Sequence, residues 1–556
     1  MSSSAETTIS VRERTTALAL LAFAVILRIP YIFHYRFNSD EPQHLHVVWG
    51  WARGLLQYRD TFDNHTPLFH LTMAPFLALF GEHAWTMFAM RFVMLPLYLL
   101  SLALTFTLAR RLYSERVALW AAVLLAVHFE FFFVSLEFRT DTLWTVTWLA
   151  ALVVLVGGRL TAGRALAVGL LLGWAAGVSQ KTGLLVASLA AGTALTLVLV
   201  PQTRRRLSAR RAAMLAGAAT AGFLVVPALL AASFAAAGAF DAFLYGTVQH
   251  GTLPGLGKTG HAWRVLLFPV GLALVLWLSA PMIRSANGDR LRSMRLALAF
   301  TAAVYYLSVQ SFWPLVTAQD WMPFSPLLAI FVVAGLAAWA ARRGDARRPA
   351  AVLVALLAVE VAILVFKGPV WEDRAAPAAA LVSETLRLTD PGDWIIDAKG
   401  ETVFRRRALP WVLENITQER LRRGLIRDTL AQDAVATGCW AAVVEDERFT
   451  DRARAFLAGN YVPVGQLRVA GTILGAPADD RRLLPFTVLI PGPYAIVAER
   501  GTASGLLDGT PYESPRRLAA GHHEVVPAVG SGRLAVVWAQ AAARGFSPFL
   551  PDRGAR

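Results

Sequence analysis

The chain has 556 residues, of which 56% are hydrophobic and 16% are charged, and its mean hydropathy is positive. These proportions exclude an ordinary water-soluble globular protein, because so few charges would not cover its surface. The net charge of +15 would suit a nucleic-acid-binding protein, but the arginines responsible cluster in short connections between apolar segments. We therefore expect a membrane protein with no nucleic-acid partner.

Apolar segments of about the length needed to cross a bilayer as helices follow one another over the first two thirds of the chain. They begin near Thr16, Ala84, Val117, Thr142, Ala165, Leu184, Ala212, Trp263, Met294, Pro323 and Ala350. The predicted fold class is a polytopic α-helical membrane protein with about eleven transmembrane helices and a C-terminal extracytoplasmic α/β plus β domain. We expect residues 1–370 to form the membrane domain.

The basic residues alternate between the two sides of the predicted membrane. Arg12 and Arg14 precede the first segment, and every second connection after it is rich in Arg, as at 204–211 and 342–348. By the positive-inside rule the N-terminus is cytoplasmic, and an odd number of crossings leaves the C-terminal part outside a bacterial-type inner membrane. The first segment is too long and uninterrupted for a cleaved signal peptide, so we expect a retained anchor.

The C-terminal part contains two regions with different sequence patterns. Residues 371–480 suggest an α/β region, with a helix from Pro410 to Ala434 and a strand from Trp394 to Ile396, and residues 481–556 suggest a β-rich region. We expect the C-terminal part either to help hold an acceptor glycan or to act only as a stabilising or docking module. The single cysteine, Cys439, is expected to be a small buried hydrophobic residue.

A long outer loop at 34–83 carries most of the ionisable residues of the membrane half. Asp40 and Glu41 stand together near its start, before a predicted amphipathic helix at 43–57 that would lie along the membrane surface. Adjacent acids at a helix start also cap the helix dipole, so this pair alone does not indicate chemistry. Arg91, Arg139, Asp141 and Lys181 are predicted near the same side, and charges at hydrocarbon depth are usually paired or line a polar cavity.

The ordered set of motifs resembles the GT-C superfamily of membrane glycosyltransferases, and within it the branch of protein O-mannosyltransferases and lipid A aminoarabinose transferases. The resemblance covers about residues 16 to 340. It is carried by Ser39-Asp40-Glu41, by Tyr58 to Leu68 with Asn64-His65-Thr66-Pro67-Leu68, by Arg91-Phe92, and by Gly177 to Gly183. At Thr317 to Pro323 the chain departs from the pattern. Many relatives have Arg-Tyr two residues before a Leu-Leu-Pro in this region, whereas this chain has the acidic residue Asp320.

The resemblance implies transfer of a sugar from a polyprenyl-phosphate donor to a hydroxyl of a glycolipid, glycan or protein at the outer surface of the lipid bilayer. Asp40 would be the base that takes the acceptor proton, and Glu41 would orient the acceptor or increase the basicity of Asp40. Arg91 and Lys181 would bind the leaving phosphate.

The same resemblance gives roles to four further residues. His65 occupies the position of a phosphate-contacting lysine, with a hydrogen-bonded loop histidine as the alternative. Arg139 and Asp141 would either form a structural salt bridge or contact substrate. Asp320 would contact sugar hydroxyls, unless the donor phosphate is held wholly from the first loop and Lys181.

No cofactor is expected, because Asp40 and Glu41 lack the further acidic ligands that a divalent ion usually needs, although a divalent metal stays open. Two other classes of protein remain. A secondary transporter would usually show paired halves with interrupted helices, and no such repeat is present. A non-catalytic scaffold of a glycan assembly complex would not require the acidic pair.

Overall fold

The computed structural model describes residues 9–205, 207–255, 265–284, 290–313, 315–343, 346–443, 447–474, 483–528 and 532–550. The chain divides into two compact units. One, here called the helical unit, consists of Met1–Tyr35, Asn64–Thr72 and Met90–Asp373. The other, here called the mixed unit, consists of Arg36–Asp63, Met73–Ala89 and Arg374–Arg556.

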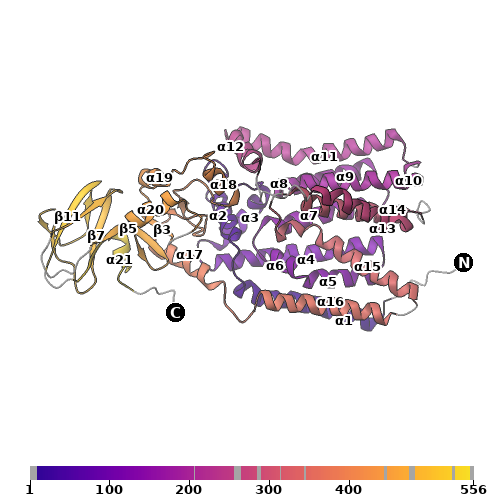
Figure 1. Cartoon of the computed structure of the whole chain (residues 1–556), viewed down its shortest axis with the longest axis horizontal. Helices are drawn as coiled ribbons and strands as arrows, with labels where there is room; N and C mark the ends of the chain where they lie inside the picture. Colours follow the sequence, from indigo (N-terminus) through magenta and orange to yellow (C-terminus); the bar gives the residue numbers. More distant parts are fainter. Residues whose placement is uncertain are drawn as a thin grey trace. The chain divides into compact units, whose positions relative to one another are not determined.

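The helical unit is built from long helices that run side by side (Figure 1). Helix α3 (Leu68–Phe80) and helix α4 (Thr86–Leu112) contribute to both units. The other elements are α1 (Val11–His34), α5 (Glu115–Val127), α6 (Phe129–Leu136), α7 (Thr140–Val156), α8 (Ala162–Val178), α9 (Thr182–Leu199), α10 (Pro201–Arg205), α11 (Ala209–Ala236), α12 (Phe240–Leu244), the π-helix η1 (Tyr245–Gln249), α13 (Leu267–Arg284), α14 (Arg290–Phe312), the 3-10 helix η3 (Ala318–Trp321), α15 (Ser325–Arg343) and α16 (Arg347–Lys367).

The polytopic membrane fold is confirmed, and a helix or a bent pair of helices stands at each segment predicted to cross the membrane. Within the described residues, six helices are long and apolar enough to cross a bilayer, namely α1, α4, α9, α11, α15 and α16. The pair α5 and α6, bent by 65°, would be a seventh, and α7, α8 and α13 are shorter in apolar length. The total of about eleven crossings stays a prediction, and Trp263, where one was expected to begin, lies outside the described residues.

Glycines allow α8 and α11 to approach closely. A Cβ atom at Gly169 or Gly173 of α8 would collide with the carbonyl oxygen of Ala219 or Phe223 of α11, and one at Gly222 would collide with Leu166. Small residues spaced four apart let helix backbones approach closely where no hydrophobic effect drives association. The pair α8 and α11 therefore depends on the Gly residues at these positions.

The bend between α5 and α6 leaves the first N–H groups of α6 without helical partners. Glu360 of α16 accepts a hydrogen bond from Phe129 N at 3.0 Å and lies 3.1 Å from His128 Nδ1. A carboxylate from a neighbouring helix thus caps the interrupted segment.

The mixed unit contains helix α2 and all the strands. Its elements are α2 (Asp40–Ala52), α17 (Ala376–Leu388), β1 (Trp394–Ile396), β2 (Arg406–Arg407), α18 (Asn415–Arg422), α19 (Leu430–Thr437), β3 (Ala441–Val443), α20 (Asp451–Asn460), β4 (Tyr461–Val464), β5 (Leu467–Leu474), β6 (Leu484–Val488), β7 (Gly492–Ala498), β8 (Gly505–Leu507), β9 (Thr510–Pro511), β10 (Arg516–Leu518), β11 (Gly521–Pro527), β12 (Leu534–Trp538) and α21 (Ala539–Ala543).

Strands from both parts of the C-terminal sequence join in one eight-stranded sheet of order β10-β7-β12-β5-β3-β1-β2, with β4 paired to β5. Strand β1 is parallel to both β2 and β3, and the remaining pairs are antiparallel. A second sheet has the order β6-β11-β8-β9. The predicted boundary at 480/481 lies outside the described residues, and the larger sheet draws strands from either side of it.

Two local predictions are wrong. The stretch at 43–57 is not an amphipathic surface helix, because α2 ends at Ala52 and all ten residues from Glu41 to Gly50 are buried. The helix predicted from Pro410 to Ala434 is two short helices, since Gly424 adopts a φ of +68° just after α18 and ends it.

Candidate functional site

The two adjacent acids of the outer loop lie at the start of α2 in different environments. Asp40 is the first residue of α2, its side chain is 22% exposed, and its N–H donates to Asn38 Oδ1 at 3.1 Å. Glu41 is fully buried, and its carboxylate accepts a hydrogen bond from Asn38 N at 2.9 Å. Glu41 thus fixes the turn that leads into the helix, whereas the carboxylate of Asp40 reaches solvent.

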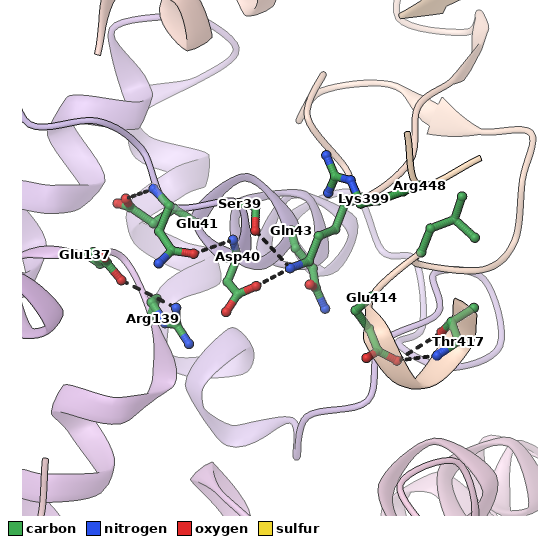
Figure 2. A network of polar contacts seen from close by, with 12 residues as sticks. Ser39, Asp40, Glu41, Gln43, Glu137, Arg139, Lys399, Glu414, Thr417 and Arg448 are labelled. Atoms are coloured by element: carbon green, nitrogen blue, oxygen red, sulfur yellow. Dashed lines mark hydrogen bonds and ion pairs between the residues drawn. The ribbon is translucent and has the colours of Figure 1, made fainter. Parts of the chain in front are cut away.

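Asp40 forms an ion pair with a lysine from the far end of the sequence. Lys399 Nζ donates to Asp40 Oδ1 and lies 3.2 Å from Ser39 Oγ (Figure 2). The Lys399 side chain is only 8% exposed, which makes it the more deeply buried partner. The carboxylate is therefore held beside a fixed positive charge.

Lys399 lies in the connection from β1 to β2, and the buried carboxylate of Asp397 shapes this connection. Asp397 Oδ1 accepts from Gly400 N at 2.9 Å and from Arg407 Nε at 2.5 Å, and its Oδ2 accepts from Thr402 N and Oγ1. Burial alone would raise the pKa of Asp397, but Arg407, His46 and the bonds from Thr402 together hold that pKa below its usual value. Asp397 is thus a charged anchor for the connection.

A second carboxylate ties α2 to the segment that follows α17. Glu82 accepts hydrogen bonds from Trp49 Nε1 at 2.9 Å, from Arg53 Nε at 3.0 Å and from Arg405 Nη1 at 3.0 Å. The pKa of Glu82 lies below its usual value, because these donors outweigh the effect of its burial. Glu82 therefore holds one side of α2 to Arg405, six residues beyond Lys399.

The helical unit contains a buried charge cluster at the junction of α6 and α7. Arg139 Nε lies 3.2 Å from Asp141 Oδ2, and Arg139 Nη1 lies 3.4 Å from Glu137 Oε2. The Arg139 side chain is 3% exposed. The predicted salt bridge between Arg139 and Asp141 is present, with Glu137 as a third member.

Lys181 and Asp320, predicted as separate substrate contacts, are partners of one another. Lys181 Nζ lies 2.5 Å from Asp320 Oδ1, and Asp320 Oδ2 accepts from Thr317 N and Oγ1 at 2.8 and 2.9 Å. Asp320 is buried, whereas the Lys181 side chain is 23% exposed at the start of α9. The lysine is therefore the member of the pair that reaches solvent.

The two remaining predicted residues differ in their exposure. Arg91 is buried in α4, and its Nη1 donates to the carbonyl oxygens of Ile32 at 3.1 Å and Tyr35 at 2.8 Å, at the end of α1. His65 is half-buried just before α3. Arg91 therefore fastens a helix end whose carbonyl groups would otherwise lack partners.

Cys439 is fully buried and donates to Ala441 O at 3.3 Å, and burial raises the pKa of its thiol above the usual range. The predicted hydrophobic role of this residue is confirmed. Because it is the only cysteine of the chain, no thiolate is available as a soft metal ligand.

Comparison with known proteins finds similarity to membrane glycosyltransferases. The family model for dolichyl-phosphate-mannose-protein mannosyltransferase matches residues 64–230. ArnT from Cupriavidus metallidurans bound to undecaprenyl phosphate has a similar structure, with a TM-score of 0.54 and 12% sequence identity over 83% of this chain and 98% of that one. The chain therefore has the fold of ArnT over most of its length, and residues 64–230 match a mannosyltransferase family model. The apo form of the same ArnT gives a TM-score of 0.53 with 13% identity, over 82% of this chain and 98% of that one.

A more remote likeness is to the archaeal oligosaccharyltransferase AglB from Archaeoglobus fulgidus, with a TM-score of 0.43 and 12% identity over 78% of this chain and 70% of that one. No curated protein matches the chain. At 12–13% identity the two ArnT structures establish the fold of this chain alone.

Sequence reasoning missed Lys399 as a candidate site residue. The chain has four lysines among 53 basic residues, and two of them, Lys181 and Lys399, pair with the candidate acids Asp320 and Asp40. The scarcity of lysine was the available signal, but it gave no indication of which acid each lysine would meet.

Proposed function

We propose that this protein is an inverting glycosyltransferase that moves a monosaccharide from a polyprenyl-phosphate carrier to a hydroxyl of a glycolipid, cell-envelope glycan or protein. The transfer takes place on the extracytoplasmic side of a bacterial-type inner membrane, with the N-terminus in the cytoplasm. The observation that carries the proposal is the partly exposed Asp40 carboxylate, held beside Lys399 at the start of a buried helix in a chain with the GT-C fold. The ArnT structure with bound undecaprenyl phosphate supports the class of donor.

In this proposal Asp40 is the general base. The acceptor oxygen attacks the anomeric carbon while its proton passes to Asp40, and the bond from the anomeric carbon to the phosphate oxygen breaks. The bonding electrons leave with the polyprenyl phosphate, so attack and departure on opposite faces invert the anomeric configuration. Glu41 supports the base by fixing the turn at Asn38.

The leaving phosphate gains negative charge and needs a nearby cation. We assign this role to Lys181, because it is the more exposed member of its ion pair. Asp320 restrains the lysine, and a bound phosphate would take over part of that restraint. His65 would donate a hydrogen bond to the phosphate, whereas the buried Arg91, Arg139 and Asp141 would keep the structure of the helical unit.

The test is sugar transfer by the purified protein in lipid, with radiolabelled polyprenyl-phosphate hexose or pentose as donor and a membrane extract as acceptor. Asp40→Asn keeps the shape of the side chain and removes the base, so it is expected to lower transfer by about 10²–10⁴ while donor binding is retained. Asp451→Asn, which removes a 97% exposed carboxylate, is the matched control and is expected to match the wild type.

The product should carry the inverted anomeric configuration, which NMR of the linkage reports. Transfer by Asp40→Asn at the wild-type rate would overturn the assignment of the base. If the wild type transfers sugar from no polyprenyl donor, the enzyme proposal fails. A transporter or a non-catalytic scaffold would then be the better explanation.

A further inference from the structure

The connection from β1 to β2 brings Lys399 to the base from a segment that follows all the membrane helices in sequence. Lys399 and Asp40 are 359 residues apart, and the lysine contacts both Asp40 and its neighbour Ser39. The contact therefore joins the first outer loop to the C-terminal part of the chain within the mixed unit.

The backbone around Lys399 is fixed by several bonds. Lys399 N donates to Glu401 Oε2 at 2.7 Å, and Glu401 in turn pairs with Arg448 at 2.6 Å. Just beyond Lys399, Gly400 N and Thr402 N donate to the carboxylate of Asp397, which is fully buried. Lys399 is therefore presented from a rigid frame rather than from a mobile surface loop.

This frame lies directly against α2. Gly400 has a φ of +87°, and a Cβ atom there would lie 3.0 Å from His46 Cβ and 3.3 Å from Gln43 Cα. Val403 is held at a φ of +58°, which is unfavourable for a β-branched residue, and its carbonyl oxygen lies 2.8 Å from His46 Nδ1. The backbone is strained where it meets the helix that begins with Asp40, and such strain persists only where the surrounding structure holds it.

The identity of the cation also fits a positioning role. A lysine ammonium is a compact point charge that fits beside one carboxylate oxygen and one hydroxyl, whereas an arginine fork would occupy a broader face of the carboxylate. In a chain with 53 basic residues and four lysines, lysine stands at this position.

We propose that Lys399 is a positioning residue for the base Asp40, and that the β1–β2 connection of the C-terminal segment is thereby a required part of the active site. This inference rests on the proposed transferase function. Lys399 orients the carboxylate through Oδ1 and keeps a positive charge beside it before the acceptor arrives. The C-terminal segment then serves catalysis directly and is more than a docking module.

The experiment compares Lys399→Met, Lys399→Arg and the wild type as full-length protein in lipid, measuring kcat, the donor KM and the melting temperature. Arg533→Met is the matched control, since it removes a cation from an exposed ion pair with Glu499 in the same unit. Lys399→Met is expected to lower kcat at least about tenfold with less than about a threefold change in donor KM, and Lys399→Arg is expected to recover part of kcat. Arg533→Met should match the wild type.

A purely structural role would predict a different result. Lys399→Met would then melt at a lower temperature, but the folded enzyme, counted by donor binding, would keep the wild-type kcat. That result overturns this inference and leaves the transferase proposal intact. Absence of transfer by the wild type overturns both.

Discussion

Lys181 Nζ and Asp320 Oδ1 are 2.5 Å apart, although the two residues are separated by 139 positions in the sequence. A cation predicted to bind phosphate and an acid predicted to contact sugar thus restrain one another. Asp320 is buried and also accepts two hydrogen bonds from Thr317, so it is the fixed member of the pair.

Substitutions of Lys181 and of Asp320 are expected to affect donor binding differently. Lys181→Ala removes the cation proposed to bind the phosphate and is expected to raise the donor KM at least about tenfold, equivalent to about 1.4 kcal/mol. Asp320→Asn releases the lysine while an amide oxygen still accepts from Thr317, so the donor KM is expected to fall or stay unchanged. Titration of each variant with polyprenyl phosphate checks this, and equal weakening by both variants would return Lys181 to a structural role.

The cluster around Arg139 predicts a loss of stability. Arg139→Met leaves Glu137 and Asp141 buried without their shared cation, which typically costs about 3–5 kcal/mol, whereas Arg139→Lys keeps the charge and should cost less. Thermal unfolding in detergent measures both variants. An unchanged melting temperature together with a higher donor KM would favour the alternative in which Arg139 contacts substrate.

His46 predicts a dependence of stability on pH. Burial, followed by the charge of Arg407, lowers the pKa of His46 to about 4, from 6.5 in its unperturbed state. Above pH 6.5 His46 is neutral in both the folded and the unfolded protein. Between pH 6.5 and 4 it takes up a proton only in the unfolded chain. Stability is therefore lost as the pH falls through this window, by up to about 3 kcal/mol.

Melting temperatures of the wild type and His46→Asn at pH 7.5 and 5 check this dependence. The decrease on acidification should be smaller in His46→Asn, because asparagine does not titrate and its amide can still donate to Val403 O. His522→Asn, at an exposed position, is the control and should behave as the wild type. Equal decreases in all three proteins would contradict the role of His46.

At Gly400 we expect the close contact with α2 to matter for stability and transfer in addition to the positive φ angle. Both Gly400 and Gly424 have positive φ angles, but no atom lies within 4 Å of a Cβ built at Gly424. Gly424→Ala is expected to cost about 1 kcal/mol of stability from strain alone. Gly400→Ala should cost more and should also lower transfer, since the new Cβ presses on His46 and moves Lys399. Similar effects of the two substitutions on melting and transfer would show that the contact with α2 is unimportant.

The sequence predicts the helices of this protein better than its long-range contacts. Long apolar segments identify membrane helices because the bilayer sets both their length and their composition, and strand β1 is found at its predicted residues. The ion pairs at Asp40 and Asp320 could not be predicted in this way, since they join residues 359 and 139 positions apart in the sequence. Burial of α2 was also missed, because its mixture of polar and aromatic residues is equally typical of a surface helix.

The order of strands in the larger sheet bears on how the protein matures. Strand β12, the last in chain order among the described strands, lies between β7 and β5, and within the described residues it joins β7 and β10 to the rest of the sheet. While the nascent chain is still on the ribosome, the membrane helices and β1 precede β12 by many residues. The sheet that carries the connection with Lys399 is complete only when β12 emerges. A premature stop codon before β12 would therefore leave a chain with its membrane helices but without a complete sheet.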